Sequence, residues 1–324
     1  MKAHASTGRV SLVVAALVIT LIAVAALSLG WGYADNDAAI VWNIRAPRLV
    51  LALVVGAGLA VAGVLLQGVF LNPLAAPSIV GVSASGAAGA TVGAALGLSF
   101  NSLPLAVVAA LVAGGALMIV RAISTVHGDV NSNAVLLGGI AMSFLALAIV
   151  LIATPFIDRA AGRSFAFWSN GSFALATWNA VLTVLPFIIV GAIVALLISR
   201  YLDPMSLGSG VASALGVPAA RISTWALIAV VLLVAPAVSV VGIVSFVGLV
   251  IPHAMRQLIG PRHATLIPVA AVAGAVLVAL ADLIARGVLA PIELPVGAIT
   301  ALVGAPVFLV LLRRMVQGRI AGAR

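Results

Sequence analysis

The sequence has no cysteine, its one lysine is Lys2, and charged residues make up only 7% of its 324 residues. Without cysteine the chain has no disulfide, no thiol nucleophile and no thiolate metal site. A nucleotide-binding loop of the pattern G-x-x-x-x-G-K-[ST] needs a lysine that reaches the phosphates, and Lys2 cannot belong to one. Any ATP that drives this protein must therefore be hydrolysed by a partner. Soluble domains carry about 25% charged residues, so a water-covered globule is also excluded.

Hydrophobic residues, in contrast, account for 64% of the chain, and the mean hydropathy is +1.34. No hydrophilic stretch is long enough for a separate soluble domain, so residues 1–324 are interpreted as a single, all-α integral membrane domain. The formal net charge of +9 is spread over loop ends and does not indicate nucleic-acid binding.

Ten apolar stretches are long enough, or nearly so, to cross a bilayer as helices. The segment Pro236–Pro252 also fits a broken or re-entrant helix instead of two clean crossings. The ten expected helices are Val10–Trp31, Pro47–Val69, Val80–Leu98, Leu103–Arg121, Asn133–Pro155, Trp178–Ser199, Ile222–Val240, Val241–Leu258, Thr265–Arg286 and Pro295–Leu312.

The distribution of positive charge predicts the orientation of these helices. If the N-terminus is cytoplasmic, eleven of the 16 lysine and arginine residues lie on the inner side and five on the outer side. This excess agrees with the positive-inside rule, so both termini are predicted to be cytoplasmic. Arg45, Arg48 and Arg286 then lie outside, and the break at Asn72–Pro77 lies inside.

Two sets of motifs occur in order along the chain. The first set is Arg45-Ala46-Pro47-Arg48, Gly56–Gln67, Asn72-Pro73-Leu74-Ala75 and Gly81-Val82-Ser83, and the second is Gly242–Arg256, Ala281-Asp282 to Arg286 and Glu293–Phe308. These motifs resemble those of the permease subunits of type II ABC importers, which take up iron siderophores, haem and vitamin B12.

The resemblance implies a homodimer, or occasionally a pseudo-dimer with a close homologue, of ten-helix subunits in the bacterial cytoplasmic (inner) membrane, with the transport pathway on the dimer axis. It also implies two cytoplasmic ATPase subunits, which bind ATP and Mg, and an extracytoplasmic binding protein that delivers the ligand. By motif match, Arg45 and Arg48 would dock acidic residues of that binding protein, with Arg286 as a weaker candidate. The alternative from residue type alone is that these arginines anchor helix ends at the lipid headgroups.

The segment of about residues 200–221 is the longest predicted inner connection. The resemblance implies that it is the coupling loop that contacts the ATPase, and the alternative is a plain surface connector. Its glycines predict two short helices, broken at Gly208–Gly210 and Gly216–Pro218. The candidate contact residues are Leu207, Gly208, Ala214, Leu215, Gly216 and Val217.

The break after the second expected helix has two interpretations. The resemblance implies that Asn72, Ser83 and Ser85 lie beside the inner gate of the pathway. The alternative is that the following Gly/Ser/Ala-rich stretch serves close helix packing. Leu71 stands where many family members have arginine, which weakens the transfer.

Few other polar residues lie within the expected helices. Asp282 is expected to pair with Arg286 four residues later, in preference to a proton-relay role. His253 is expected to be structural, and the histidines at positions 4, 127 and 263 form no metal-binding pattern. The outer segment Thr154–Trp178 is expected to hold a short interfacial helix, with its tryptophans in the aromatic belt.

The sequence therefore predicts a non-catalytic permease subunit of an ATP-driven importer, which binds no cofactor or metal of its own. An iron chelate, siderophore or haem, is the favoured cargo, and vitamin B12 is the alternative. A secondary transporter driven by an ion gradient is a different class, supported only by Asp282.

Overall fold

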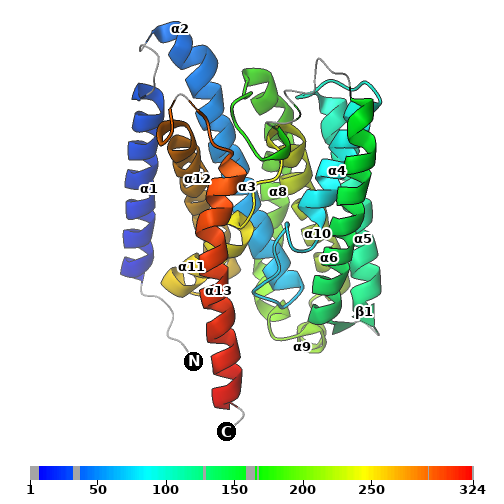
Figure 1. Ribbon diagram of the computed structural model, residues 1–324. Helices are drawn as coiled ribbons and strands as arrows, with labels where there is room; N and C mark the ends of the chain where they lie inside the picture. Colours follow the sequence, from blue (N-terminus) through cyan, green and yellow to red (C-terminus); the bar gives the residue numbers. More distant parts are fainter. Residues whose placement is uncertain are drawn as a thin grey trace.

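The described residues of the computed structural model (7–31, 37–126, 129–157, 165, 168–290 and 292–322) form mostly long helices that stand side by side (Figure 1). The described residues also contain one two-stranded antiparallel ribbon, in which β1 pairs with β2. In chain order the elements are α1 (Thr7–Gly30), α2 (Ala38–Ile40), the π-helical turn η1 (Val41–Arg45), α3 (Ala46–Val69), α4 (Val82–Ala95), α5 (Leu103–Ser124), β1 (Thr125–Val126), β2 (Asp129–Val130), α6 (Ser132–Ala153), the 3-10 turn η2 (Thr154–Phe156), α8 (Trp178–Met205), α9 (Ser209–Ala214), α10 (Ala219–Val241), α11 (Val247–Ile259), α12 (His263–Gly287) and α13 (Val296–Gly322).

A helix occupies the place of each of the ten expected spans, but the helices differ in length. Seven of those in the described residues are long and apolar enough to cross a membrane. α4 has 14 residues and α11 has 13. At about 1.5 Å per residue they reach only about 20 Å, less than the roughly 30 Å of a hydrocarbon core. Ten complete crossings therefore remain a prediction.

Polar caps define where several helices begin. The side chains of Ser102 and Thr177 accept hydrogen bonds from the backbone N–H groups of Leu105 and Ala180, in the first turns of α5 and α8. Asn131 does the same at the start of α6. Each cap satisfies backbone donors that have no partner within the helix, so these boundaries follow directly from the local sequence.

α3 is the central helix of the bundle. It contacts α8, α10, α11 and α12, and Leu51 and Ala52 are completely buried. Two glycines allow its neighbours' backbones to approach. A Cβ atom at Gly56 would collide with the carbonyl oxygen of Gly274 in α12, and one at Gly63 would collide with that of Gly248 in α11. The Gly/Ala-rich composition of α3 therefore serves close packing, whereas peripheral α1 is only 6% buried.

The sequence between α10 and α11 is a true break. α10 ends at Val241, and an extended segment runs through Gly242 (φ 74°) to the start of α11. The backbone N–H of Ser172 donates to the Val241 carbonyl (2.9 Å), and the indole of Trp168 donates to the Val238 carbonyl (2.9 Å). The interruption falls between the two expected spans, and the choice between two crossings and a broken or re-entrant helix stays a prediction.

The environment of Trp168 corrects an expectation. Trp168 is 4% exposed and caps carbonyls of α10, so it is not a residue of the aromatic belt. The expected short helix of the outer segment falls largely on positions 158–164 and 166–167, which lie outside the described residues.

Candidate functional site

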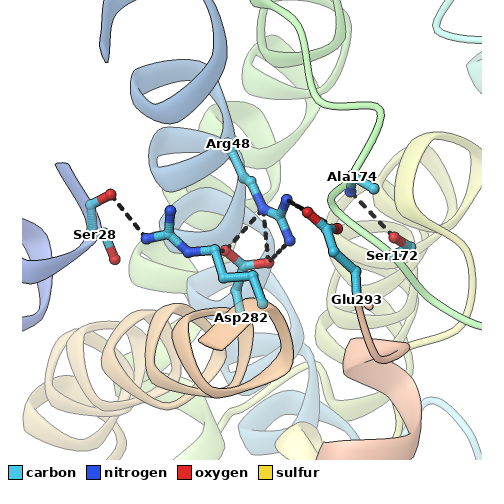
Figure 2. Close-up of polar contacts among 7 residues, drawn as sticks. Ser28, Arg48, Ser172, Ala174, Asp282 and Glu293 are labelled. Atoms are coloured by element: carbon cyan, nitrogen blue, oxygen red, sulfur yellow. Dashed lines mark hydrogen bonds and ion pairs between the residues drawn. The ribbon is translucent and has the colours of Figure 1, made fainter. Parts of the chain in front are cut away.

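A buried cluster of charges joins the start of α3 to the end of α12. The Arg48 guanidinium donates through Nε and Nη2 to Oδ1 of Asp282, at 3.0 and 2.9 Å. Its Nη1 donates to Oε1 of Glu293 at 2.9 Å. Figure 2 shows Arg48 between the two carboxylates, one from α12 and one from the α12–α13 connection. Such charge-assisted, forked contacts fix geometry as well as charge.

Two further arginines extend this cluster to α1. Arg45 donates to the carbonyl of Leu29, and Arg286 donates to that of Ser28, both at 2.8 Å. Both carbonyls lie in the last turn of α1, where backbone acceptors have no partner within the helix and the helix dipole favours positive charge. We call Arg45, Arg48, Asp282, Arg286 and Glu293 the outer cluster. Its three arginines and two carboxylates leave one net positive charge.

The expected pairing within α12 is present but is not the main contact. Nε of Arg286 lies 3.9 Å from Oδ2 of Asp282, at the limit of an ion pair. The short contacts of Asp282 are with Arg48, 234 positions away in sequence. The i to i+4 rule could not reveal this partner, because it reports on one helix face only.

The three docking candidates lie together; Arg45 and Arg48 are buried, and Arg286 is partly buried. Arg45 is 5% exposed and Arg48 is 7% exposed. The Glu293 side chain, at 36%, is the most accessible carboxylate of the cluster. Sequence reasoning did not single out Glu293, although it is the only glutamate in the chain and stands in the second motif set. Docking through these arginines stays a prediction, and it has to account for the carboxylates that already hold Arg48.

The candidate gate residues lie around the turn between α3 and α4. Asn72 is buried, and its side-chain oxygen accepts the backbone N–H of Leu74 at 2.9 Å. Leu71 precedes it with a left-handed backbone (φ 47°). Ser83 and Ser85 are each 2% exposed in the first turn of α4. Asn72 is thus occupied in shaping the turn, and a gating role for all three residues stays a prediction.

The candidate coupling loop lies at the opposite end of the bundle. α9 is at the bottom of Figure 1, at the end where α1 begins and α13 ends. Its flanking residues Leu207 and Leu215 are 64% and 63% exposed. Ala214 and Gly216 are exposed as well, Gly208 is half-buried, and Val217 is buried against the core.

The loop contains one short helix where two were expected. Gly208 and Gly216, with φ of 103° and 79°, bound α9 on both sides, as their positions predict. The first of the two expected helices is instead the end of α8, which continues as one helix through Pro204 to Met205. The exposed leucines on either side of α9 form a small apolar surface at this end.

A polar contact between α8 and α12 at this end was not expected. Oδ1 of Asp203, in the last turn of α8, accepts the backbone N–H of His263 at 2.9 Å and lies 2.6 Å from its Nδ1. The sequence motifs assign no role to His263 or Asp203. Among the described residues, no group of three or more His, Cys, Asp or Glu side chains forms a metal site, and His4 and His127 lie outside those residues.

Comparison with known proteins decides the family. The model of the FecCD transport family matches residues 5–314. The chain belongs to this family. FecCD relatives include the hemin transport system permease protein HmuU of Yersinia pestis, which is 40% identical over 89% of this chain and 88% of its own length. The Fe(3+) dicitrate transport system permease protein FecD of Escherichia coli is 40% identical over 90% of both chains.

One further relative is named for a different ligand, and another has a solved structure. The cobalamin import system permease protein BtuC of Halobacterium salinarum is 39% identical over 89% of this chain and 77% of its own length. A solved, inward-facing structure of a putative metal-chelate type ABC transporter is 33% identical, with a TM-score of 0.81 over 94% of this chain and 99% of that one. The fold is therefore that of an ABC importer permease.

Proposed function

We propose that this FecCD-family permease is the membrane-spanning subunit of an ATP-driven importer that carries an iron chelate, a siderophore or haem, through the axis of a homodimer. The family match over residues 5–314 carries this proposal. The cargo is the finer part of it. Relatives are named for hemin, ferric dicitrate and cobalamin, so vitamin B12 is the alternative cargo within the same function.

The outer cluster is the proposed docking site for an extracytoplasmic binding protein with acidic contact residues. Its net positive charge attracts carboxylates, and Glu293 is half-exposed beside Arg48. An incoming carboxylate would replace Glu293 on Nη1 of Arg48, while Asp282 keeps the buried side of the guanidinium paired. Docking is then an exchange of one carboxylate for another, which avoids leaving a buried charge unpaired.

The segment 200–221 is the proposed contact for two cytoplasmic ATPase subunits. This chain has no lysine that could serve a nucleotide-binding loop, so any ATP must be bound, with Mg, and hydrolysed by partner chains. The exposed Leu207 and Leu215 offer that partner apolar anchors on either side of α9. ATP binding by the partners would move this loop and change the side toward which the pathway opens.

Reconstitution tests the function as a whole. Proteoliposomes that contain the permease, its ATPase and its binding protein should take up hemin or ferric dicitrate only when ATP is supplied. Uptake by the permease alone, driven by an ion gradient, would support a secondary transporter and overturn the proposal. Uptake of cobalamin in place of both iron chelates would replace the cargo and leave the importer function intact.

A further inference from the structure

The contact between Asp203 and His263 ties together helices that are far apart in sequence. Asp203 belongs to the last turn of α8, and His263 is the first residue of α12. The carboxylate makes two contacts with this one residue, to its backbone N–H (2.9 Å) and to its ring Nδ1 (2.6 Å). The His263 side chain is 5% exposed, whereas that of Asp203 is 38% exposed.

α12 depends on this carboxylate for its N-terminal cap. Arg262, the residue at its own cap position, makes no capping hydrogen bond with its side chain. The first N–H groups of a helix need acceptors, and a negative charge there is favoured by the helix dipole. Asp203 therefore supplies from α8 the acceptor that the start of α12 lacks.

The histidine ring extends the connection to α3. A Cβ atom at Gly68 would lie 3.1 Å from Nε2 of His263, so the ring rests directly on the backbone of α3 in its last turns. The left-handed turn at Leu71 and the buried Asn72 follow immediately. One carboxylate thus joins the end of α8 to the start of α12 and, through the ring, to the end of α3.

The position of Asp203 gives this contact its significance. α8 ends two residues later at Met205, and Gly208 (φ 103°) then turns the chain into α9. α9 itself contacts α8 and α10. A force on α9 therefore enters α8 near Asp203. Apolar helix faces can slide past one another, but a charged acceptor that holds both a backbone and a ring donor resists sliding.

We propose that Asp203 and His263 form an inner clasp through which movement of the loop at residues 200–221 reaches α12 and α3. They are positioning residues, not ligand contacts. This inference rests on the proposed function of that loop as the ATPase contact. In this proposal the side chains of Asp203 and His263 transmit the movement. They act at the inner end of α12 and α3, and the outer ends of the same two helices carry the outer cluster.

The variant Asp203→Asn distinguishes a clasp from a simple helix cap. Asparagine caps helices as well as aspartate does, so a pure cap predicts that Asp203→Asn behaves like the unaltered protein while Asp203→Ala does not. A clasp needs the negative charge opposite the ring, so Asp203→Asn should behave like Asp203→Ala. His263→Asn keeps the backbone N–H, removes the ring and should match both. The double variant should be no worse than either single one.

The absence of cysteine makes the structural measurement direct. Ser206 and Leu280 are both exposed, and cysteines introduced in their place can carry spin labels. The labels report the distance between the end of α8 and α12 in lipid nanodiscs. Labelled chain is diluted into unlabelled chain. Asp203→Asn should broaden the distance distribution. Asp37→Asn, which alters the carboxylate cap of α2 at the opposite end, is the matched control and should not. An unchanged distribution in Asp203→Asn overturns the clasp.

The functional measurement distinguishes the clasp from the loop contact. In complexes reassembled with the ATPase, His263→Asn, which lies outside the segment 200–221, should keep ATPase capture and ATP hydrolysis but lower uptake per ATP by about tenfold, within the usual range of coupling between sites. The probe is whichever of hemin and ferric dicitrate the unaltered complex carries. Leu215→Asp should abolish capture. Normal uptake per ATP in His263→Asn, with capture lost in Leu215→Asp, refutes the clasp alone. Normal capture in Leu215→Asp refutes the loop contact.

Discussion

α3 and α12 run in opposite directions, and the polar contacts at their two ends differ in kind. At the outer end, Arg48 is buried between Asp282 and Glu293, and two more arginines hold the last turn of α1. At the inner end, a single half-exposed carboxylate holds His263. Buried charges are costly to separate, whereas exposed ones contribute little. The contacts at the outer end should therefore cost more free energy to separate than the contact at the inner end.

The largest effect should come from removing the buried carboxylate at the outer end. Asp282→Ala leaves Arg48 without its main partner at a buried site, which should lower the free energy of unfolding by about 3–5 kcal/mol. Denaturant-induced unfolding in mixed micelles measures this. Asp203→Ala, the matched change at the inner end, should cost about 1 kcal/mol, because it removes one helix cap. Equal losses at the two ends would contradict the contrast.

The contact between the middle of α3 and α11 should be the next most sensitive region. Gly63→Ala places a methyl group against the carbonyl of Gly248, and such overpacking costs about 1–3 kcal/mol. Gly115→Ala in α5, where nothing lies within 4 Å of the added atom, is the control and should cause no loss. The same unfolding measurement applies. A neutral Gly63→Ala would mean that α3 and α11 separate easily.

The sequence predicted the places of the ten helices, the α10–α11 break and the family, because these depend on long apolar runs, prolines and local motifs. It did not predict the partners of Arg48 or the contact of Asp203 with His263. Those pairs join residues 234 and 60 positions apart, and no local spacing rule reaches that far. Arg45, Arg48 and Arg286 lie close together, and their docking role stays a prediction; the motifs did not indicate their contacts with α1 and Glu293.

Changing the charge of the outer cluster should have a smaller effect on stability. Removing a negative charge and removing a positive charge should have opposite effects on docking. Glu293→Gln should cost at most about 1 kcal/mol of stability, as expected for a partly exposed ion pair. By freeing Nη1 of Arg48 and raising the net charge, it should tighten docking of the binding protein about threefold to fivefold, which equals about 1 kcal/mol. Arg45→Gln should weaken docking. Surface-based titration in nanodiscs measures both.

These two variants have informative failures. Changes of the same sign in both would show that shape, and not charge, decides docking. No change in either would remove the outer cluster from the docking site.

The smallest effect on stability should come from the exposed loop at the inner end. Leu215→Asp replaces a 63% exposed side chain and should change the free energy of unfolding by less than about 0.5 kcal/mol. It should nevertheless prevent co-purification of the ATPase. Leu289→Asp, 52% exposed and beyond the outer end of α12, is the control and should leave co-purification intact. Loss of the ATPase in both would point to general misfolding.

Beside the break between α10 and α11, backbone hydrogen bonds join three distant parts of the chain. Val241, at the end of α10, accepts from Ser172, and Gly171 accepts from Gly297 in the first turn of α13. Such bonds are costly to separate where no water can replace them. The end of α10, residues 168–172 and the start of α13 are therefore expected to move as one unit.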